Sequence, residues 1–164
     1  MSEATRPGFQ REYAAVLAAR LAEPRRFVQV VAGPRQVGKT TLVQQVLAKG
    51  DRANLFVAAD EPALRDGAWL TAQWERARLL AKDAGKDGAV LALDEVQKVP
   101  DWSETVKRLW DEDTRHRLAL RVVLLGSAPL LVQRGLAESL AGRFEILHLP
   151  HWSFAEMRAA FGYS

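Results

Sequence analysis

Apolar residues along this chain follow two patterns that alternate from one end to the other. Short continuous apolar runs have the length of buried strands, and they occupy residues 27–32, 54–59, 89–93, 122–125 and 145–149. Between them, apolar side chains recur at helical spacing, with polar residues on the opposite face. Strands that alternate with helices favour a parallel sheet covered on both faces. The pattern therefore predicts an α/β fold.

Turn and capping residues mark the boundaries of the expected helices. We expect helices at residues 9–21, 42–49, 69–82 and 128–140, and a last helix that ends near Phe161. The segment 83–88 contains two glycines and predicts a turn after the helix at 69–82. Asp101, with Glu104 three residues later, has the spacing of a capping box and predicts a further helix. Ser153 is expected to cap the last helix.

The turn between the first strand and the next helix carries a glycine-rich motif. It fits the pattern G-x-x-x-x-G-K-[ST], and its residues are Gly33, Pro34, Arg35, Gln36, Val37, Gly38, Lys39, Thr40 and Thr41. Glycines let backbone N–H groups surround a phosphate, and the helix N-terminus adds partial positive charge. We expect Lys39 to neutralise the β- and γ-phosphates and the Thr40 hydroxyl to bind Mg²⁺. A turn with an exposed lysine is the alternative, but the strand-to-helix context favours binding of a nucleoside triphosphate.

The apolar run at 89–93 ends in two adjacent carboxylates, Asp94 and Glu95. At the carboxyl end of a central strand, Asp94 is expected to hold Mg²⁺ directly or through water. Glu95 is expected to face the crevice, where it orients and deprotonates an attacking water. Two acids are needed because a carboxylate bound to the metal is a poor base. Alone, such a pair indicates a helix cap or a solvent-exposed turn, but downstream of a phosphate loop it favours catalysis.

Three further residues are candidates for contact with the nucleotide. Ser127 follows the fourth strand, whose end lies between the phosphate-loop and Asp94 strands in the additional-strand ATPase topology. Its hydroxyl could contact the γ-phosphate or the attacking water, could cap the following helix, or could do both. Arg143 is the first candidate for an arginine that stabilises charge in phosphoryl transfer, and Arg134 is the second. The alternative for both is a surface arginine without a catalytic role.

The composition of the chain limits the number of domains, the partners and the compartment that we expect. The chain has 164 residues, enough for one domain, and its net charge of +3 is too small to indicate nucleic-acid binding. It contains no cysteine, which fits a reducing compartment. We expect a cytoplasmic protein, since the sequence shows neither a secretory signal nor an apolar run that could cross a bilayer. The tryptophans keep helical spacing and the histidines lack metal-ligand spacing, which predicts core packing and no metal besides Mg²⁺.

Three separated segments resemble a widespread prokaryotic family of AAA-type ATP-binding proteins. They read GPRQVGKTTL, LDEVQKVPDWSETVKRLWD and ESLAGRFEILHLPHWSFAEM, and the resemblance extends from the helix near Phe9 to Phe161. It implies the additional-strand P-loop fold, with five parallel strands in the order 5-1-4-3-2. It places Gly33, Gly38, Lys39, Thr40 and Thr41 on the phosphates. It also implies ATP as the nucleotide. The choice of adenine over guanine rests on the resemblance alone, because the sequence has no base-reading N-K-x-D motif.

The same resemblance implies roles for the other candidates and for parts outside this sequence. It makes Asp94 the metal ligand, Glu95 the catalytic acid, Ser127 the γ-phosphate sensor and Arg143 an inter-subunit or sensor arginine. Family members usually continue into a second domain, thought to resemble a restriction-type nuclease and to contact nucleic acid. Because the sequence ends at Ser164 directly after a helix, we interpret residues 1–164 as the AAA-type ATPase domain alone, with slow hydrolysis.

Three functions are compatible with these motifs. The first is an Mg²⁺-dependent ATPase that converts loss of the γ-phosphate into movement of an attached domain or partner, with an arginine supplied by a second copy. The second is a nucleotide-dependent interaction module that does not hydrolyse ATP. The third is a small-molecule kinase, but the acid pair favours water as the acceptor. Replacing Glu95 with Gln separates the first two, because only an ATPase loses turnover while it keeps ATP binding.

Overall fold

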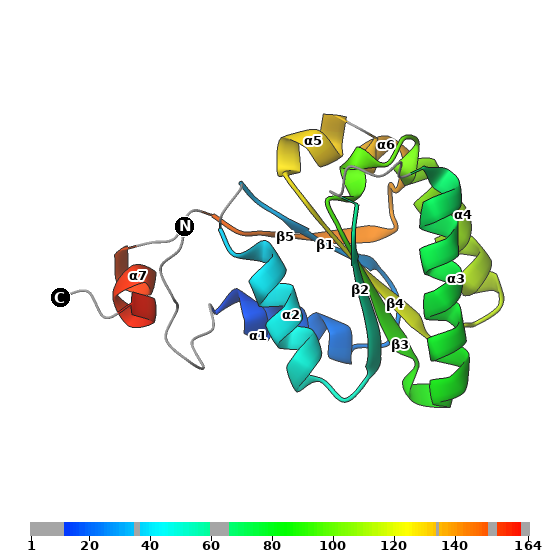
Figure 1. Ribbon diagram of the computed structural model, residues 1–164, viewed down its shortest axis with the longest axis horizontal. Coiled ribbons are helices and arrows are strands. Elements are labelled where there is room, and N and C mark those ends of the chain that lie inside the picture. Colours follow the sequence, from blue (N-terminus) through cyan, green and yellow to red (C-terminus); the bar gives the residue numbers. More distant parts are fainter. Residues whose placement is uncertain (1–11, 35–36, 60–65, 134, 151–153, 162–164) are drawn as a thin grey trace.

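A parallel sheet forms the centre of the molecule. The computed structural model describes residues 12–34, 37–59, 66–133, 135–150 and 154–161, and within them five strands lie in the order β2-β3-β4-β1-β5 (Figure 1). The strands are β1 (Val28–Ala32), β2 (Ala53–Ala58), β3 (Ala89–Asp94), β4 (Leu120–Gly126) and β5 (Phe144–His148). Counted from β5, this order is 5-1-4-3-2, and all neighbours are parallel. The expected α/β class and strand order are confirmed.

Helices cover both faces of this sheet (Figure 1). On one face lie α1 (Tyr13–Ala22) and α2 (Lys39–Lys49), and on the other lie α3 (Gly67–Ala84) and α4 (Trp102–Arg115). The shorter helices are η1 (Gly85–Asp87), η2 (Val96–Lys98), α5 (Ala128–Gln133), α6 (Leu136–Ser139) and α7 (Phe154–Phe161). Among the helices in the described ranges, none has the length and apolar character to cross a bilayer.

Successive residues of a strand contribute to two separate apolar layers. Val30 of β1 packs in the layer beneath α3 and α4, whereas Val31 packs in the layer beneath α1 and α2. Because both faces are covered, every residue of β1 and β3 is buried, and such strands appear in the sequence as continuous apolar runs. Trp74, Trp102 and Trp110 are all buried in the first layer, which confirms the core role expected for them. Trp152 lies outside the described residues.

The strand register brings three functional segments to one edge of the sheet. Ala32, the last residue of β1, pairs with Gly126 of β4, and Asp94 of β3 pairs with Leu125 of β4. The ends of β1, β4 and β3 therefore lie side by side. The phosphate loop leaves β1 at this edge, and the acid pair leaves β3 there.

The capping box expected at Asp101 and Glu104 is wrong. Asp101 precedes α4 with φ 55° and ψ 28°, and its side chain makes no capping hydrogen bond. A side-chain cap requires an extended backbone, so this left-handed conformation turns the carboxylate away from the first helical N–H groups. Glu104 instead accepts a hydrogen bond from the Ser139 hydroxyl, at 2.6 Å between Oε1 and Oγ. A side-chain cap does occur at α3, where Asp66 accepts from the backbone N–H of residue 69.

The single helix expected at 128–140 is also wrong, because the segment forms two helices, α5 and α6. Gly135 separates them with φ 105°, a conformation outside the helical range. A Cβ at this position would lie 2.7 Å from the Ser103 hydroxyl of α4. The close approach to α4 therefore favours glycine at the break. Residue 134 and the expected cap Ser153 lie outside the described residues.

Candidate nucleotide-binding site

The phosphate loop connects β1 to α2 and depends on two glycines. Gly38, the residue before α2, has φ 84° and ψ 26°, a left-handed conformation that residues with a Cβ rarely adopt. A Cβ on Gly33 would lie 2.5 Å from the Leu149 carbonyl oxygen, because the chain after β5 passes directly against the loop. Arg35 and Gln36 lie outside the described residues, so their contacts with phosphate stay predictions.

Lys39 is the first residue of α2 and is 8% exposed. Its ammonium group donates to the carbonyl oxygens of Gly33, at 2.9 Å, and Pro34, at 2.8 Å. A buried ammonium needs such partners, because its removal from water costs free energy that hydrogen bonds must offset. The contacts hold a positive charge within the loop, beside the N-terminus of α2. Of the neighbouring motif residues, Val37 is buried and Thr41 is exposed.

Thr40 joins the loop to the strand that carries the acids. Its hydroxyl donates to Asp94 Oδ2 at 2.6 Å, although 54 positions separate the two residues in the chain. Asp94 is the last residue of β3 and is 7% exposed. Hydroxyl and carboxylate oxygens suit Mg²⁺, which takes few protein ligands when phosphate and water oxygens are also available. The donor set therefore fits the metal role expected for both residues.

A closed metal site built only from protein ligands is not found in the described ranges. No group of three or more histidines, aspartates or glutamates gathers there to hold an ion. His116 and His148 are exposed, and His151 lies outside these ranges. Thr40 and Asp94 place two oxygen ligands together beside the loop.

Glu95 follows β3 directly and is held by a neighbour that the sequence did not single out. Its backbone is left-handed, with φ 56° and ψ 36°, and its side chain is half-buried. Gln97 of η2 donates from Nε2 to Glu95 Oε2 at 2.6 Å. A non-glycine residue in this region of backbone space is strained, and such strain concentrates at functional sites. The only sequence signal for Gln97 is its position two residues after the acid.

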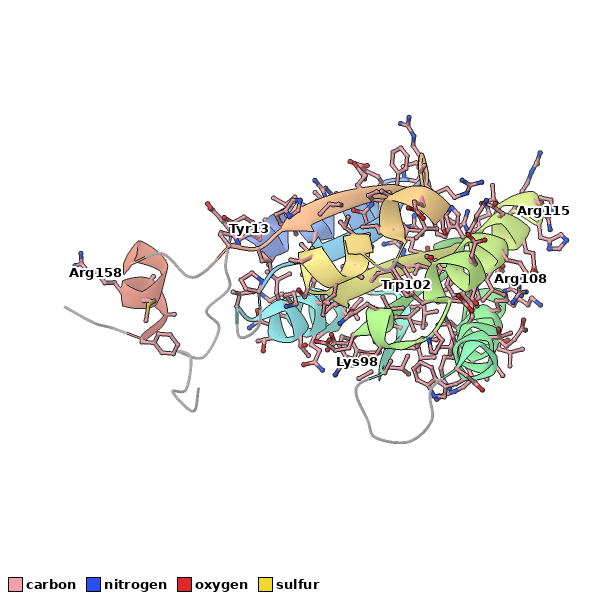
Figure 2. The ribbon with its side chains drawn as sticks, turned by 90° about the horizontal axis from the view of Figure 1, so that it is seen from above. Tyr13, Lys98, Trp102, Arg108, Arg115 and Arg158 are labelled. Atoms are coloured by element: carbon pink, nitrogen blue, oxygen red, sulfur yellow. The ribbon has the colours of Figure 1, made fainter. Side chains whose placement is uncertain are left out.

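A cavity of about 540 Å³ opens beside the loop. Its lining includes Gly33, Pro34, Ser127, His148, Leu149 and, from α1, Tyr13. In Figure 2 Tyr13 lies between Arg158 on one side and Arg108 and Arg115 of α4 on the other. Ser127 lies next to the loop because the carbonyl of Gly126 accepts a hydrogen bond from the N–H of Gly33 at 3.3 Å. The Ser127 carbonyl accepts from the N–H of Leu131 in α5, and a contact of its hydroxyl with phosphate stays a prediction.

Arg143 is not brought to the phosphate loop of its own chain. It precedes β5, and its carbonyl accepts from the N–H of Val28 at the start of β1. The loop leaves the other end of β1, and a strand of this length spans about 16 Å. Its guanidinium binds Asp111 of α4, with Nε and Nη2 2.8 and 3.0 Å from the two carboxylate oxygens. Arg134, the second candidate, lies outside the described residues.

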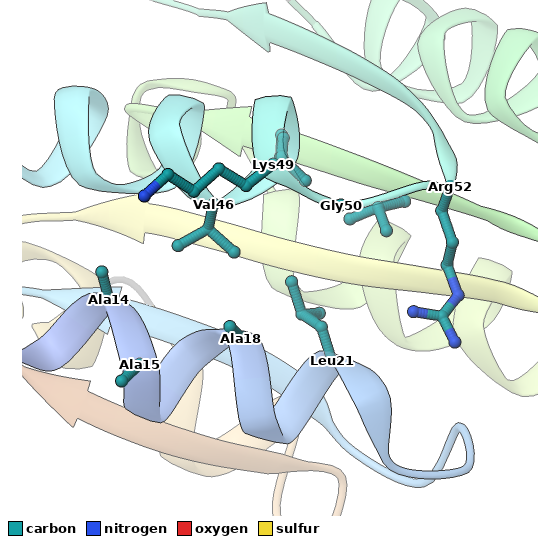
Figure 3. A pocket seen from close by; sticks show the side chains of 10 residues that line it. Ala14, Ala15, Ala18, Leu21, Val46, Lys49, Gly50 and Arg52 are labelled. Atoms are coloured by element: carbon teal, nitrogen blue, oxygen red, sulfur yellow. The ribbon is translucent and has the colours of Figure 1, made fainter. Parts of the chain in front are cut away.

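A second cavity, of about 210 Å³, lies between α1 and α2 (Figure 3). Small apolar side chains such as Ala14, Ala18 and Val46 line it, together with Lys49 and Arg52. It lies at the end of α2 opposite Lys39, and helix geometry separates these two ends by about 15 Å. This cavity is therefore distinct from the phosphate loop, and it contains neither of the paired acids.

The fold and the loop geometry define a P-loop nucleotide-binding domain of the AAA type. Residues 25–158 match the family model described as AAA domain, so the chain belongs to this family. The match contains the phosphate loop, the acid pair, Ser127 and Arg143. Among curated proteins, none matches the chain significantly.

A similar fold occurs in the Orc1 protein of Aeropyrum pernix, solved in complex with DNA. The two structures superimpose with a TM-score of 0.63 at 17% sequence identity. The similarity covers 90% of this chain and 46% of the Orc1 chain, so this chain spans about half the length of that protein. At this identity the likeness demonstrates a shared fold.

Proposed function

We propose that this chain is an Mg²⁺-dependent ATPase domain. The observation that carries the proposal is the 2.6 Å contact between the Thr40 hydroxyl and Asp94, because it joins the phosphate loop to the acid strand. A surface turn with an exposed lysine would need neither this contact nor a buried Lys39. Membership of the AAA domain family supports ATP as the nucleotide.

Binding of the triphosphate would depend on the loop and on the start of α2. The N–H groups around Gly38 and the partial positive charge of the helix N-terminus favour phosphate oxygens at this position. Lys39 supplies a full positive charge for the β- and γ-phosphates. Thr40 and Asp94 would hold Mg²⁺ through their oxygens. When bound, this ion neutralises charge that develops on the phosphate oxygens.

Hydrolysis would depend on Glu95. Its carboxylate follows the strand that ends in Asp94, so the acid pair can divide the work between metal binding and proton transfer. Glu95 would accept a proton from the attacking water and orient that water in line with the γ-phosphate. Ser127, at the end of the adjacent strand β4, would contact the γ-phosphate or the same water.

The distance of Arg143 from its own loop favours a role in a neighbouring copy. In phosphoryl transfer an arginine can be supplied by a second molecule, where it stabilises charge in the transition state. Arg143 is partly exposed, and Asp111 and the Ala141 carbonyl accept three of its five N–H donors, which leaves two donors for a second copy. We therefore propose a homo-oligomer in which Arg143 completes the site of the adjacent subunit.

The attached partner is proposed from the family and from the similar structure. A prokaryotic origin, a nuclease-like domain after residue 164 and a cytoplasmic location all fit the family resemblance. The similar Orc1 protein binds DNA, which supports nucleic acid as the material on which ATP-driven movement acts. The ATPase domain would then switch the attached domain between two states as the γ-phosphate is lost.

The test measures ATP binding and phosphate release separately. Titration calorimetry gives the Kd for ATP with Mg²⁺, and phosphate release gives turnover per subunit over a range of protein concentrations. Lys39→Ala should lose binding, whereas Glu95→Gln should keep binding and lose turnover. Turnover per subunit in the unchanged chain should rise with concentration if Arg143 acts in trans. Binding without turnover at every concentration would instead identify a non-hydrolysing nucleotide switch.

A further inference from the structure

Gln97 is a buried polar residue beside the proposed catalytic acid. It lies in η2, two residues after Glu95, and only 2% of it is exposed. Its Nε2 atom donates to Glu95 Oε2 at 2.6 Å, a short contact typical of a hydrogen bond to a charged acceptor. The contact occupies one carboxylate oxygen of Glu95 and leaves the other to accept a proton from water.

The oxygen of the Gln97 amide, Oε1, is closely packed. Gln97 Oε1 is buried and makes no hydrogen bond to any described residue. It lies against Gly126, where a Cβ built on the glycine would approach it to 2.4 Å. The reverse orientation of the amide would place its carbonyl oxygen against the Glu95 carboxylate, which is repulsive. The contact with Glu95 therefore sets the orientation of the amide.

A buried acceptor without a partner destabilises the fold, and an apolar side chain of similar size would avoid that cost. Methionine would fill the same volume without an unpaired oxygen. Core packing alone therefore does not explain a glutamine at this position. The hydrogen bond of its side chain to Glu95 does explain it.

Gly126 contacts both the Gln97 amide and the phosphate loop. It is the last residue of β4, it precedes Ser127, and its carbonyl accepts from the N–H of Gly33 at 3.3 Å. The same residue thus touches the start of the loop and leaves room for the Gln97 amide. A side chain at position 126 would displace that amide and with it the support of Glu95.

We propose that Gln97 is the positioning residue of Glu95, held in place by the absence of a side chain at Gly126. The inference rests on the proposed function, because it assigns Glu95 the role of base. Gln97 does not touch the substrate. It fixes the carboxylate while itself staying neutral, so it neither competes for the metal nor repels the phosphates.

The first test replaces Gln97 with Met in the 164-residue chain, at the protein concentration where turnover per subunit is highest. This variant keeps the volume and loses the donor. We expect kcat to fall by about ten-fold or more, a part of the roughly 10²–10⁴-fold that general base catalysis contributes, with KM for ATP within about two-fold. The matched control is Lys98→Met, because Lys98 lies on the same turn and is exposed (Figure 2). It should leave kcat unchanged.

The split between kcat and KM separates positioning from a general loss of structure. A misplaced Glu95 carboxylate lowers kcat alone, because the phosphate loop that binds ATP is intact. A disordered site would also raise KM for ATP.

A double-mutant cycle tests the role of Gly126. Gly126→Ala alone should lower kcat, because the new Cβ displaces the Gln97 amide. In a Gln97→Ala background the amide is absent and only the looser contact of the new Cβ with Leu131, at 3.1 Å, remains, so the same substitution should cost less further kcat than it does alone. Additive losses would show that Gly126 acts independently of Gln97. They would overturn the proposal that Gly126 leaves the space in which the Gln97 amide is held.

The outcomes distinguish this inference from the proposed function. If Glu95→Gln abolishes turnover but Gln97→Met leaves kcat unchanged or raises it, Gln97 does not position the base, and only this inference fails. If Glu95→Gln keeps normal turnover, the proposed role of Glu95 fails and the inference fails with it. A loss of kcat in Gln97→Met together with a fallen thermal unfolding midpoint counts as support only if KM for ATP stays within about two-fold and the cycle with Gly126→Ala is not additive; otherwise the inference fails.

Discussion

Arg143 and Asp111 form a two-pronged ion pair, with guanidinium nitrogens 2.8 and 3.0 Å from the two carboxylate oxygens. Planar pairs of this kind orient a guanidinium more firmly than a single contact does. The hydrogen bond to Asp111 also raises the pKa of Arg143, so this side chain stays charged. Because both side chains are about one third exposed, we expect the pair to orient Arg143 and to add little to stability.

A mixing experiment tests whether this arginine serves a neighbouring copy. Arg143→Ala and Lys39→Ala should each have low turnover by themselves. When the two variants are mixed, the Lys39→Ala chain can supply Arg143 to the intact loop of its partner, so phosphate release should recover to well above the sum of the two. A mixture no more active than its components would contradict action in trans. Mixing two preparations of Lys39→Ala provides the control.

The contact between Thr40 and Asp94 predicts a specific Mg²⁺ dependence. Thr40→Val keeps the shape of the side chain and removes the oxygen, so we expect turnover to fall on the order of 10²-fold and the half-saturating Mg²⁺ concentration to rise. Thr40→Ser keeps the hydroxyl and is the matched control. The measurement is phosphate release against Mg²⁺ concentration. An unchanged Mg²⁺ curve for the valine variant would remove Thr40 from the metal site.

Tyr13 lines the cavity beside Gly33 and Pro34, which predicts that it contacts the base of the nucleotide. Tyr13→Ala should weaken ATP binding by about ten-fold, since stacking of an aromatic side chain on a base contributes about 1–3 kcal/mol. Inorganic tripolyphosphate lacks a base, so its binding should not change. Tyr13→Phe keeps the ring and should bind ATP normally. Equal losses for ATP and tripolyphosphate would instead indicate damage to the phosphate loop.

A buried carboxylate between α3 and α4 predicts how stability changes with pH. Asp113 accepts from the indole N–H of Trp74 at 2.8 Å and lies 2.8 Å from Arg78. Burial raises the pKa of Asp113 above 3.8, and the indole and guanidinium groups offset this only in part. The folded chain thus holds the proton more tightly than the unfolded chain does. The contribution of Asp113 to the free energy of unfolding is therefore fully present below pH 3.8, and it is lost as pH rises through the pKa of the folded state.

Asp113→Asn should remove this pH dependence because an amide does not ionise. The measurement is the free energy of unfolding in urea, at several pH values from about 4 to 7, for both proteins. The difference in the free energy of unfolding, unchanged chain minus variant, should decrease as pH rises. An increasing difference would mean that Arg78 stabilises the ionised carboxylate more than burial disfavours it.

Much of the site could be predicted because its parts are local motifs. The phosphate loop and the acid pair each occupy consecutive residues at the end of an apolar run, and parallel strands bring such ends to one edge of the sheet. Lys39, Thr40 and Asp94 accordingly lie together at that edge. The helix split at Gly135 and the missing cap at Asp101 were not predictable from spacing. The split depends on how closely Gly135 approaches Ser103 of α4, and the missing cap depends on the left-handed backbone at Asp101.

Hydrophobic periodicity and the motif spacing were enough to predict the α/β class, the phosphate loop and the place of Asp94 beside it, since these follow from backbone conformation and chain-local chemistry. The partners of Glu95 and Arg143 emerged only when the chain was folded. The Gln97 amide fits only because Gly126, 29 positions later in the chain, has no side chain. The orientation of Arg143 depends on Asp111, which lies on α4. Contacts of this kind depend on distances between packed elements, and no pattern of neighbouring residues encodes those distances.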